Sequence, residues 1–169
     1  MKKIVITLSV LCLLMIGTHY IQAGETDKGA TTTLSTDSLN EQNIYLALLL
    51  NDIKYPEVVI SQIMIETGYL TSKLCKRNNN LLGMMVPSKR ETTAINEGGY
   101  AKYTTWIDCI LDYKLYQDYI LSRHQITSRK QYIAFLHKNY AKSPTYKTRV
   151  TQLSELYILK NPFNVVGLN

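Results

Sequence analysis

The stretch VVISQIMIETGY, residues 58–69, is the most apolar helical run of the chain beyond its N-terminus. Pro56 stands just before it, in the place of a first helical residue, and Gly68 marks the point where a helix would end. Because apolar residues fill most positions between them, we predict a helix that is buried on most sides. Glu66 is the exception, since it places an ionisable side chain at the end of this apolar segment.

Two effects should raise the pKa of Glu66. Apolar neighbours disfavour the carboxylate, and the negative end of the helix dipole disfavours it again. A carboxylic acid with a raised pKa can donate a proton near neutral pH, as a general acid must. A glutamate at a helix end can equally well turn its carboxylate into solvent, so the position alone leaves both interpretations open.

Helical periodicity returns in four other parts of the chain. These helices are expected to begin at the capping box Ser38 to Glu41 (running through about Ile53), at Thr105 (running to about Ser122), at Ser128 and at Ser143-Pro144. We expect Trp106, at the start of the second of them, to lie in the core.

Between residues 81 and 103 the sequence changes to glycine, proline, asparagine, β-branched and aromatic residues. This composition is typical of a loop followed by a small, irregular hairpin. We therefore predict an α+β fold that is mostly helical, with a small β-hairpin lobe. Such a layout commonly places a substrate cleft between the helical body and the lobe.

Three segments are expected along the 169 residues. Residues 1–23 have the positive start, apolar middle and small final residue of a secretory signal peptide. Residues 24–37 lack the apolar side chains that folding needs, and residues 38–169 form the folded domain. An apolar run of about 14 residues is shorter than the roughly 20 that a membrane span needs, so we expect cleavage and export rather than an anchor.

The chain carries 19 Lys and Arg against 13 Asp and Glu, and two of the lysines lie in the expected signal peptide. This mild positive charge is too small for a dedicated nucleic-acid binder. It would help to hold the protein on an anionic cell wall. We expect an exported monomer of the cell envelope, with no membrane span after signal cleavage.

Cys75 and Cys109 are the two cysteines of the expected mature chain. In an oxidising compartment they could form a disulfide worth roughly 3 to 4 kcal/mol, and two separate buried thiols are the alternative. His19, His124 and His137 do not have the spacing of metal ligands, and no phosphate-binding loop appears. We therefore expect neither a metal ion nor a cofactor.

Several short motifs occur in an order and spacing that resemble one known family. They are SQIMIETGY at 61–69, NNLLGM at 79–84, YAKYTTW at 100–106, ILDY at 110–113, and YA at 140–141 followed by Pro144 and Tyr146. Over most of the mature chain the sequence is similar to the glucosaminidase family of bacterial cell-wall hydrolases, glycoside hydrolase family 73. The resemblance implies a lysozyme-like fold and cleavage of the β-1,4 bond after N-acetylglucosamine in peptidoglycan.

The resemblance also implies roles for individual residues. Glu66 occupies the place of the family's general acid, in agreement with the electrostatic argument. Asn80, Leu82 and Gly83 match an element that follows the acid helix and borders the cleft. Tyr140 matches a tyrosine that the family needs near the catalytic site.

Glycoside hydrolysis normally uses a second carboxylate, roughly 5 to 10 Å from the acid. Glu91 and Glu97 lie in the part of the chain where the family places it. Glu97 is favoured, because Gly98 and Gly99 beside it would let the backbone approach a substrate closely. If neither serves, the acetamido group of the substrate could act as the nucleophile.

The chain has 13 Tyr against 2 Phe, and a tyrosine ring can stack on a sugar while its hydroxyl makes hydrogen bonds. The motifs place five near the cleft, and we expect about half to contact substrate. They are Tyr69, Tyr100, Tyr103, Tyr140 and Tyr146. Asp108 and Asp112 are expected to face solvent or to cap neighbouring backbone.

The chain departs from the family pattern in its late motif. The family usually reads Tyr-Ala-Thr-Asp-Pro there, whereas this chain has Lys142 and Ser143 before Pro144. Because Ser143 can still cap a helix, the loss of a structural aspartate explains the change more simply than a loss of catalysis.

Two other functions are compatible with these residues. A lytic transglycosylase of the same fold needs a single acid and leaves an anhydro product. A non-catalytic protein that binds glycan, or serves as a scaffold in a cell-envelope assembly, would keep the fold without the reaction. The residues favour an exported endo-β-N-acetylglucosaminidase with Glu66 as its acid.

Overall fold

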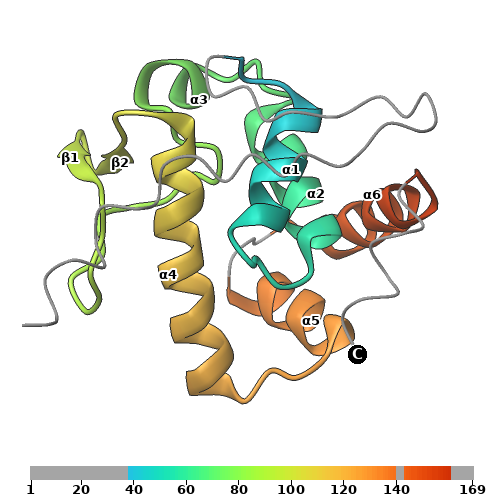
Figure 1. Ribbon diagram of the computed structural model, residues 1–169. Coiled ribbons are helices and arrows are strands. Elements are labelled where there is room, and N and C mark those ends of the chain that lie inside the picture. Colours follow the sequence, from blue (N-terminus) through green and yellow to red (C-terminus); the bar gives the residue numbers. More distant parts are fainter. Residues whose placement is uncertain (1–37, 140–142, 161–169) are drawn as a thin grey trace, which may run out of the picture. The chain divides into compact units, whose positions relative to one another are not determined.

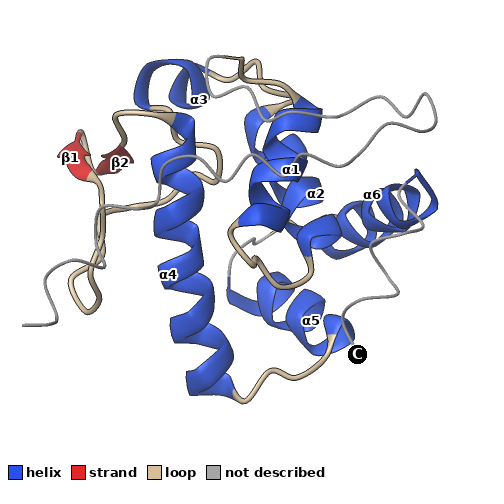
Figure 2. Cartoon of the chain, in the orientation of Figure 1, coloured by secondary structure: helices blue, strands red, loops and turns tan. Residues whose placement is uncertain are grey.

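The computed structural model describes residues 38–139 and 143–160, which form six helices and one small sheet. The elements are α1 (Glu41–Leu50), α2 (Pro56–Thr67), α3 (Lys73–Asn78), β1 (Ile95–Glu97), β2 (Tyr100–Lys102), α4 (Trp106–His124), α5 (Arg129–Asn139) and α6 (Tyr146–Lys160). The predicted α+β fold, mostly helical with a single small hairpin, is confirmed (Figures 1 and 2). The expected signal peptide and leader, residues 1–37, lie outside the described residues. No described helix is both long and apolar enough to cross a bilayer.

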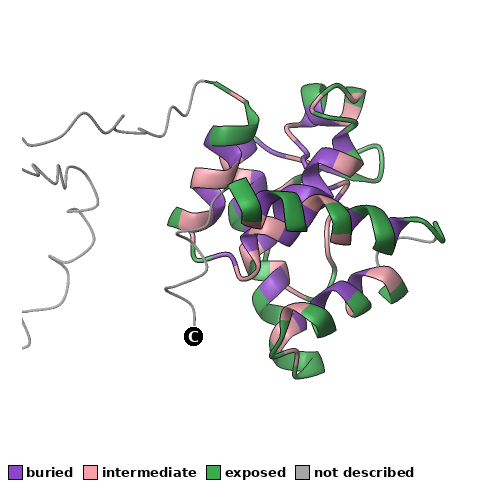
Figure 3. Ribbon diagram, turned by 90° about the vertical axis from the view of Figure 1, so that its right-hand side faces the viewer, coloured by how far each residue is buried: buried purple, intermediate pink, exposed green. Residues whose placement is uncertain are grey.

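Helix α2 packs against both α1 and α6, and its apolar side chains form much of the core. Val58, Ile60 and Ile63 are completely buried. Figure 3 shows that the buried residues lie on the faces that the helices turn toward one another. Burial of each such side chain stabilises the fold by roughly 1.5 to 3 kcal/mol. The prediction of a helix buried on most sides is therefore confirmed, and so is the burial of Trp106.

Helix α2 ends where the sequence predicted. Gly68 has a left-handed backbone with φ 56°, and the amide of Tyr69 donates to the Met64 carbonyl at 2.8 Å. Glycine adopts this conformation without a steric cost, which is why it so often ends a helix. The hydroxyl of Thr67 accepts a hydrogen bond from the Leu70 amide at 2.8 Å and tightens the following turn. These bonds fix the helix end that carries the candidate acid.

The predicted hairpin is formed by β1 and β2, which pair antiparallel with Glu97 opposite Tyr100. Gly98 and Gly99 make the turn between them, with φ of 61° and 88°. A two-residue turn with positive φ at both positions matches the natural twist of a hairpin and favours glycine at both. Asn96 supports the turn by accepting the Gly99 amide at 3.0 Å.

The cap of α1 differs from the prediction. Asn40 caps the helix, because its side-chain oxygen accepts the amide of Asn43 at 2.9 Å. Ser38 accepts a hydrogen bond from the Asn40 side chain at 3.0 Å and so supports the cap without being it. Asparagine caps helices as well as serine does, which makes the two hard to distinguish from sequence. The helix also stops at Leu50, earlier than the predicted Ile53.

The last helix likewise begins later than predicted. Ser143 and Pro144 belong to a turn, in which the Ser143 carbonyl accepts the amide of Tyr146 at 3.1 Å, and α6 starts at Tyr146. Ser128 does precede α5 as predicted, and its hydroxyl accepts the Gln131 amide at 3.3 Å.

The two aspartates of α4 have different roles. Asp108 forms a capping box with Thr105, in line with the expectation that it caps backbone. Asp112 is completely buried, so the expectation that it faces solvent or caps backbone is wrong. Arg90 donates to both of its carboxylate oxygens, at 2.6 and 3.2 Å, and the Tyr103 hydroxyl donates at 2.7 Å. The loop before the hairpin thus brings a cation onto α4, which makes burial of the carboxylate possible.

Cys75 and Cys109 are free thiols, and both are completely buried. The structure therefore has the two separate thiols rather than the disulfide. Burial raises the pKa of Cys109 to about 12, so the reactive thiolate is scarce. We expect a thiol reagent to modify neither cysteine in the native mature chain and both in denaturant without reductant. Rapid reaction of the native protein, or an absence of reaction after denaturation, would contradict this account.

Candidate active site

Glu66 lies in the last turn of α2, one residue before the helix ends. Its neighbours Ile63 and Met64 are buried in the core, whereas Glu66 itself keeps an exposed side. The carboxyl group is therefore carried by a rigid helix but remains open to a ligand. A general acid needs this combination, because it must reach the leaving oxygen without changing position.

The surroundings of Glu66 raise its pKa, in the direction that the sequence predicted. Burial is the largest cause, while the Tyr146 hydroxyl and the positive charge of Arg149 act in the opposite direction. Tyr146 and Arg149 both lie on α6, which packs against α2. Glu66 is thus partly desolvated by its neighbours and does not turn wholly into solvent. Such a carboxyl group can hold a proton at a pH where an ordinary glutamate has lost it.

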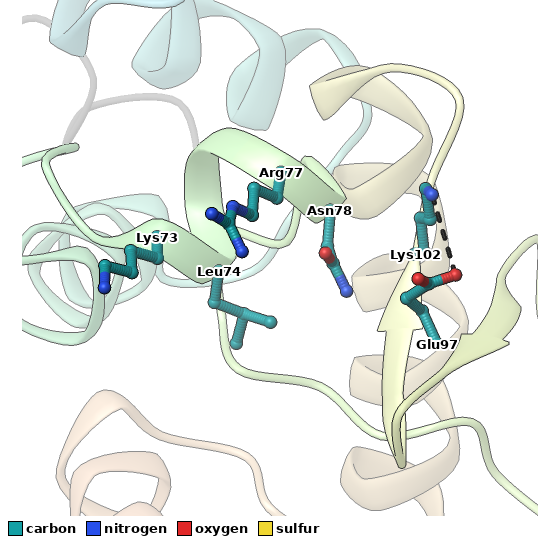
Figure 4. A pocket seen from close by; sticks show the side chains of 6 residues that line it. All are labelled: Lys73, Leu74, Arg77, Asn78, Glu97 and Lys102. Carbon is teal, nitrogen blue, oxygen red and sulfur yellow. Dashed lines mark ion pairs between the residues drawn. The ribbon is translucent and has the colours of Figure 1, made fainter.

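The hairpin lobe and α3 border an open surface cavity of about 490 Å³. Figure 4 shows the side chains that line it, which are Lys73, Leu74, Arg77, Asn78, Glu97 and Lys102. Glu97 pairs with Lys102 at 3.6 Å, so three cationic side chains share the cavity with one acidic side chain. This excess of positive charge suits a ligand that carries carboxylates.

The structure separates the two candidates for the second carboxylate. Glu97 lines the cavity next to α3, whereas Glu91 is not among the residues that line it. Glu91 is exposed, and its backbone carbonyl accepts a hydrogen bond from Arg90 at 2.7 Å. Glu66 does not line this cavity either.

Asn80 and Leu82 hold the loop that leads to the hairpin. The Asn80 amide donates to the carbonyls of Met84 and Ala101, at 2.9 and 2.8 Å, and its oxygen accepts the Met84 amide at 3.0 Å. Both side chains are about 1% exposed. They therefore hold this loop from within, and neither presents its side chain at the surface.

Gly83 is in a left-handed conformation, with φ 62°. It lines a smaller cavity of about 230 Å³ together with Arg90 and Tyr116. A Cβ atom at this position would meet no atom within 4 Å, so the backbone conformation, and not a lack of space, favours glycine here.

A family model described as mannosyl-glycoprotein endo-β-N-acetylglucosaminidase matches residues 42–159. The chain belongs to the glucosaminidase family. It is therefore a glycoside hydrolase, and the match spans the elements from α1 to α6, including Glu66 and the hairpin.

A crystal structure supports the fold of this glucosaminidase. The catalytic domain of the autolysin Auto from Listeria monocytogenes superposes with a TM-score of 0.51 at 23% sequence identity. The similarity covers 70% of this chain and 82% of that domain. Among curated proteins, none matches the chain.

Four of the five tyrosines predicted near the cleft of this glucosaminidase lie in the described residues and fall into two groups. Tyr69 and Tyr100 are 62% and 47% exposed and can stack on a sugar ring. Tyr103 and Tyr146 are both about 4% exposed, so their rings belong to the core. Tyr140 lies outside the described residues.

Gln62 is a buried polar residue of α2 that the sequence pattern did not single out. Its side chain is completely buried and lies one helical turn before Glu66, on the same face of α2. A polar residue in an otherwise apolar run, four positions before the candidate acid, was an available signal.

Among the described residues, no three metal-ligating side chains of His, Cys, Asp or Glu come together as a metal site would require.

Proposed function

We propose that this glucosaminidase is an exported peptidoglycan hydrolase, an endo-β-N-acetylglucosaminidase that cleaves between N-acetylglucosamine and N-acetylmuramic acid. The observation that carries the proposal is a glutamate with a raised pKa, fixed at the end of a buried helix and still open on one side. The sequence of residues 1–23 supports export. The cationic cavity beside α3 supports a wall substrate, because the peptide stems of peptidoglycan carry carboxylates.

In the proposed reaction, Glu66 gives its proton to the glycosidic oxygen as the bond to the anomeric carbon breaks. The positive charge that develops on the sugar is met by Glu97, acting as nucleophile or base, or by the acetamido group of the substrate. Tyr69 and Tyr100 are proposed to stack on sugar rings of the bound strand. Tyr140 is proposed to lie near the reacting groups, as the family resemblance implies, and the enzyme is proposed to act as a monomer.

Mass spectrometry of digested, purified peptidoglycan tests this reaction. We expect fragments with N-acetylglucosamine at the new reducing end. Anhydro-muramic ends would instead identify a lytic transglycosylase. If no wall preparation is cleaved at all, the proposal of an enzyme acting on peptidoglycan is wrong.

The identity of the second carboxylate can be tested by replacing each candidate in turn. We expect Glu97→Gln to lower kcat roughly a hundredfold, because it removes the group that meets the developing charge, and Glu91→Gln to leave kcat within a factor of a few. The measurement is the rate of release of reducing ends from peptidoglycan. Near-normal rates for both variants would favour the acetamido route, and a large loss with Glu91→Gln alone would contradict our choice of Glu97.

A further inference from the structure

A series of polar side chains runs through the core of the helical body without a part in the reaction above. It starts at Lys54, in the turn between α1 and α2. The backbone amide of Lys54 donates to Gln117 Oε1 at 2.7 Å, and its carbonyl accepts from Gln117 Nε2 at 2.8 Å. Because one atom accepts and the other donates, these two bonds distinguish Oε1 from Nε2 in the buried Gln117 side chain. Its Nε2 also donates to the Tyr132 hydroxyl at 3.1 Å.

The hydrogen bonds that follow must all point the same way. The Tyr113 hydroxyl donates to Gln62 Oε1 at 2.8 Å, which uses its single proton. The bond of 2.5 Å between the hydroxyls of Tyr113 and Tyr132 must then be donated by Tyr132. These bonds form a donor chain in which each side chain donates to the next. It runs from Gln117 (α4) to Tyr132 (α5), then to Tyr113 (α4) and Gln62 (α2).

This direction determines how Gln62 is oriented. Because its oxygen accepts from Tyr113, its amide nitrogen faces the other way. Gln62 Nε2 is buried and has no hydrogen-bond partner among the described residues, and neither has the buried hydroxyl of Tyr146. An unsatisfied buried donor costs about 1 to 3 kcal/mol. Two such groups on the packed helices α2 and α6 therefore call for a functional explanation.

The two unpaired groups adjoin Glu66. Burial raises the pKa of Tyr146, the Glu66 charge raises it further, and the Gln62 amide opposes the shift. Both Gln62 and Glu66 therefore lie within interaction distance of the Tyr146 hydroxyl. Arg149 on α6 also acts on Glu66, while Glu41 on α1 acts on Tyr157 instead.

We propose that Gln62 and Tyr146 are positioning residues that extend this donor chain to the Glu66 carboxyl group. In this proposal the two bonds that the structure leaves unmade form at the site: Gln62 donates to the Tyr146 oxygen, and the Tyr146 hydroxyl donates to Glu66. When Glu66 passes its proton to the glycosidic oxygen, the carboxylate that remains is held by the Tyr146 hydroxyl, which keeps its own proton. Water bound during the second half of the reaction returns a proton to Glu66. This inference rests on the proposed function of Glu66 as the acid.

The test compares Tyr146→Phe with Tyr113→Phe, and uses Tyr157→Phe as a matched control. Tyr157 is a buried tyrosine of the same helix whose hydroxyl faces Glu41 rather than the donor chain. Two readouts are needed: kcat and KM on peptidoglycan fragments against pH, and the titration of the Glu66 carboxyl carbon by NMR, which requires no activity.

For Tyr146→Phe we expect kcat to fall roughly tenfold or more, since a hydrogen bond to a charged group is lost, with KM unchanged. Glu66 should titrate at higher pH, because its carboxylate has lost a donor, and the alkaline limb of kcat should move up with it. Tyr113→Phe keeps Tyr146 but frees the Gln62 amide, so the same shifts should appear at smaller size. Tyr157→Phe should change neither readout.

If Tyr146→Phe raises KM but leaves kcat and the Glu66 titration unchanged, the inference is overturned and Tyr146 is a substrate contact. A normal titration in both chain variants would overturn it as well, even if the unmutated enzyme cleaves peptidoglycan. Conversely, an upward shift of the Glu66 titration in a protein that cleaves no wall would support the donor chain and reject the proposed function.

Discussion

Glu66→Gln is expected to lower the rate of peptidoglycan cleavage by roughly a hundredfold to ten-thousandfold, the usual effect of removing a general acid. Glutamine has nearly the same shape but no proton to give to the leaving oxygen. The residue lies at the exposed end of α2, and a glutamine there can still accept a hydrogen bond from Tyr146, so the fold should be unaffected. The melting temperature should stay the same or rise slightly, because a carboxyl group that is costly to bury has been replaced by a neutral amide.

Glu155→Gln is the matched control for this variant. Glu155 is an exposed glutamate of α6, outside the proposed site, and its replacement makes the same change in charge. The control should cleave peptidoglycan at the normal rate. If Glu66→Gln stays folded and keeps more than a tenth of the activity, Glu66 is not the acid.

Asp112→Asn is expected to have the largest effect on stability. It keeps the shape of the side chain but leaves Arg90, whose side chain is only 10% exposed, without its counter-ion. Breaking a buried pair in this way costs about 3 to 5 kcal/mol. For a domain of this size the melting temperature should fall by roughly 10 °C or more. Calorimetry or circular dichroism measures the change.

Two companion variants separate the ion pair from simple loss of charge. Asp118→Asn removes a partner of the exposed pair with Lys114, at 2.6 Å, and should cost about 0 to 1 kcal/mol. Adding Arg90→Met to Asp112→Asn should recover much of the lost stability, because the unpaired buried cation is gone. A mild effect of Asp112→Asn, or no recovery in the double variant, would contradict the role given to this pair.

The ion pair of Asp112 with Arg90 also predicts how the stability of the fold depends on pH. Burial by itself would raise the pKa of Asp112, but the hydrogen bonds from Arg90, Tyr103 and Thr92 outweigh it and lower the pKa. A group with a lowered pKa stabilises the fold above its unfolded value of about 3.9, and this contribution is lost as the pH falls below it. Acid unfolding of the unmutated protein should therefore include a part that Asp112→Asn lacks.

The elements that sequence predicted well are those with local signals. Pro56 and Gly68 delimit α2, Thr105 and Asp108 cap α4, and two adjacent glycines make the hairpin turn. Each of these signals depends on residues only a few positions apart, so it can be recognised in the sequence. The cap of α1 was misplaced for the same reason, since Ser38 and Asn40 offer similar local chemistry.

The features that sequence could not predict depend on residues far apart. Arg90 and Asp112 are separated by 22 positions, and Gln62 and Tyr113 by 51. Neither pairing has a periodic or short-range pattern, so only the packed fold reveals it. Asp112 was therefore expected to face solvent or to cap neighbouring backbone, and the buried polar network of Gln62 and Tyr113 was not predicted.

The candidate site shows the same division. The position of Glu66 and the direction of its pKa shift follow from one helix and its apolar neighbours, and both could be predicted. Asn80 and Tyr103 belong to motifs of the family, but a motif does not say whether a side chain faces the glycan or holds the loop. Their burial, and the hydrogen bonds that Asn80 makes to Met84 and Ala101, point to the second role.

The most direct test of the central claim is the titration of the Glu66 carboxyl carbon in the unmutated protein, followed by NMR against pH. The account predicts a pKa above that of an ordinary glutamate, and an alkaline limb of the cleavage rate that follows the same titration. A pKa at or below the ordinary value would contradict it, because the carboxyl group would then hold no proton to give at the pH where the enzyme works.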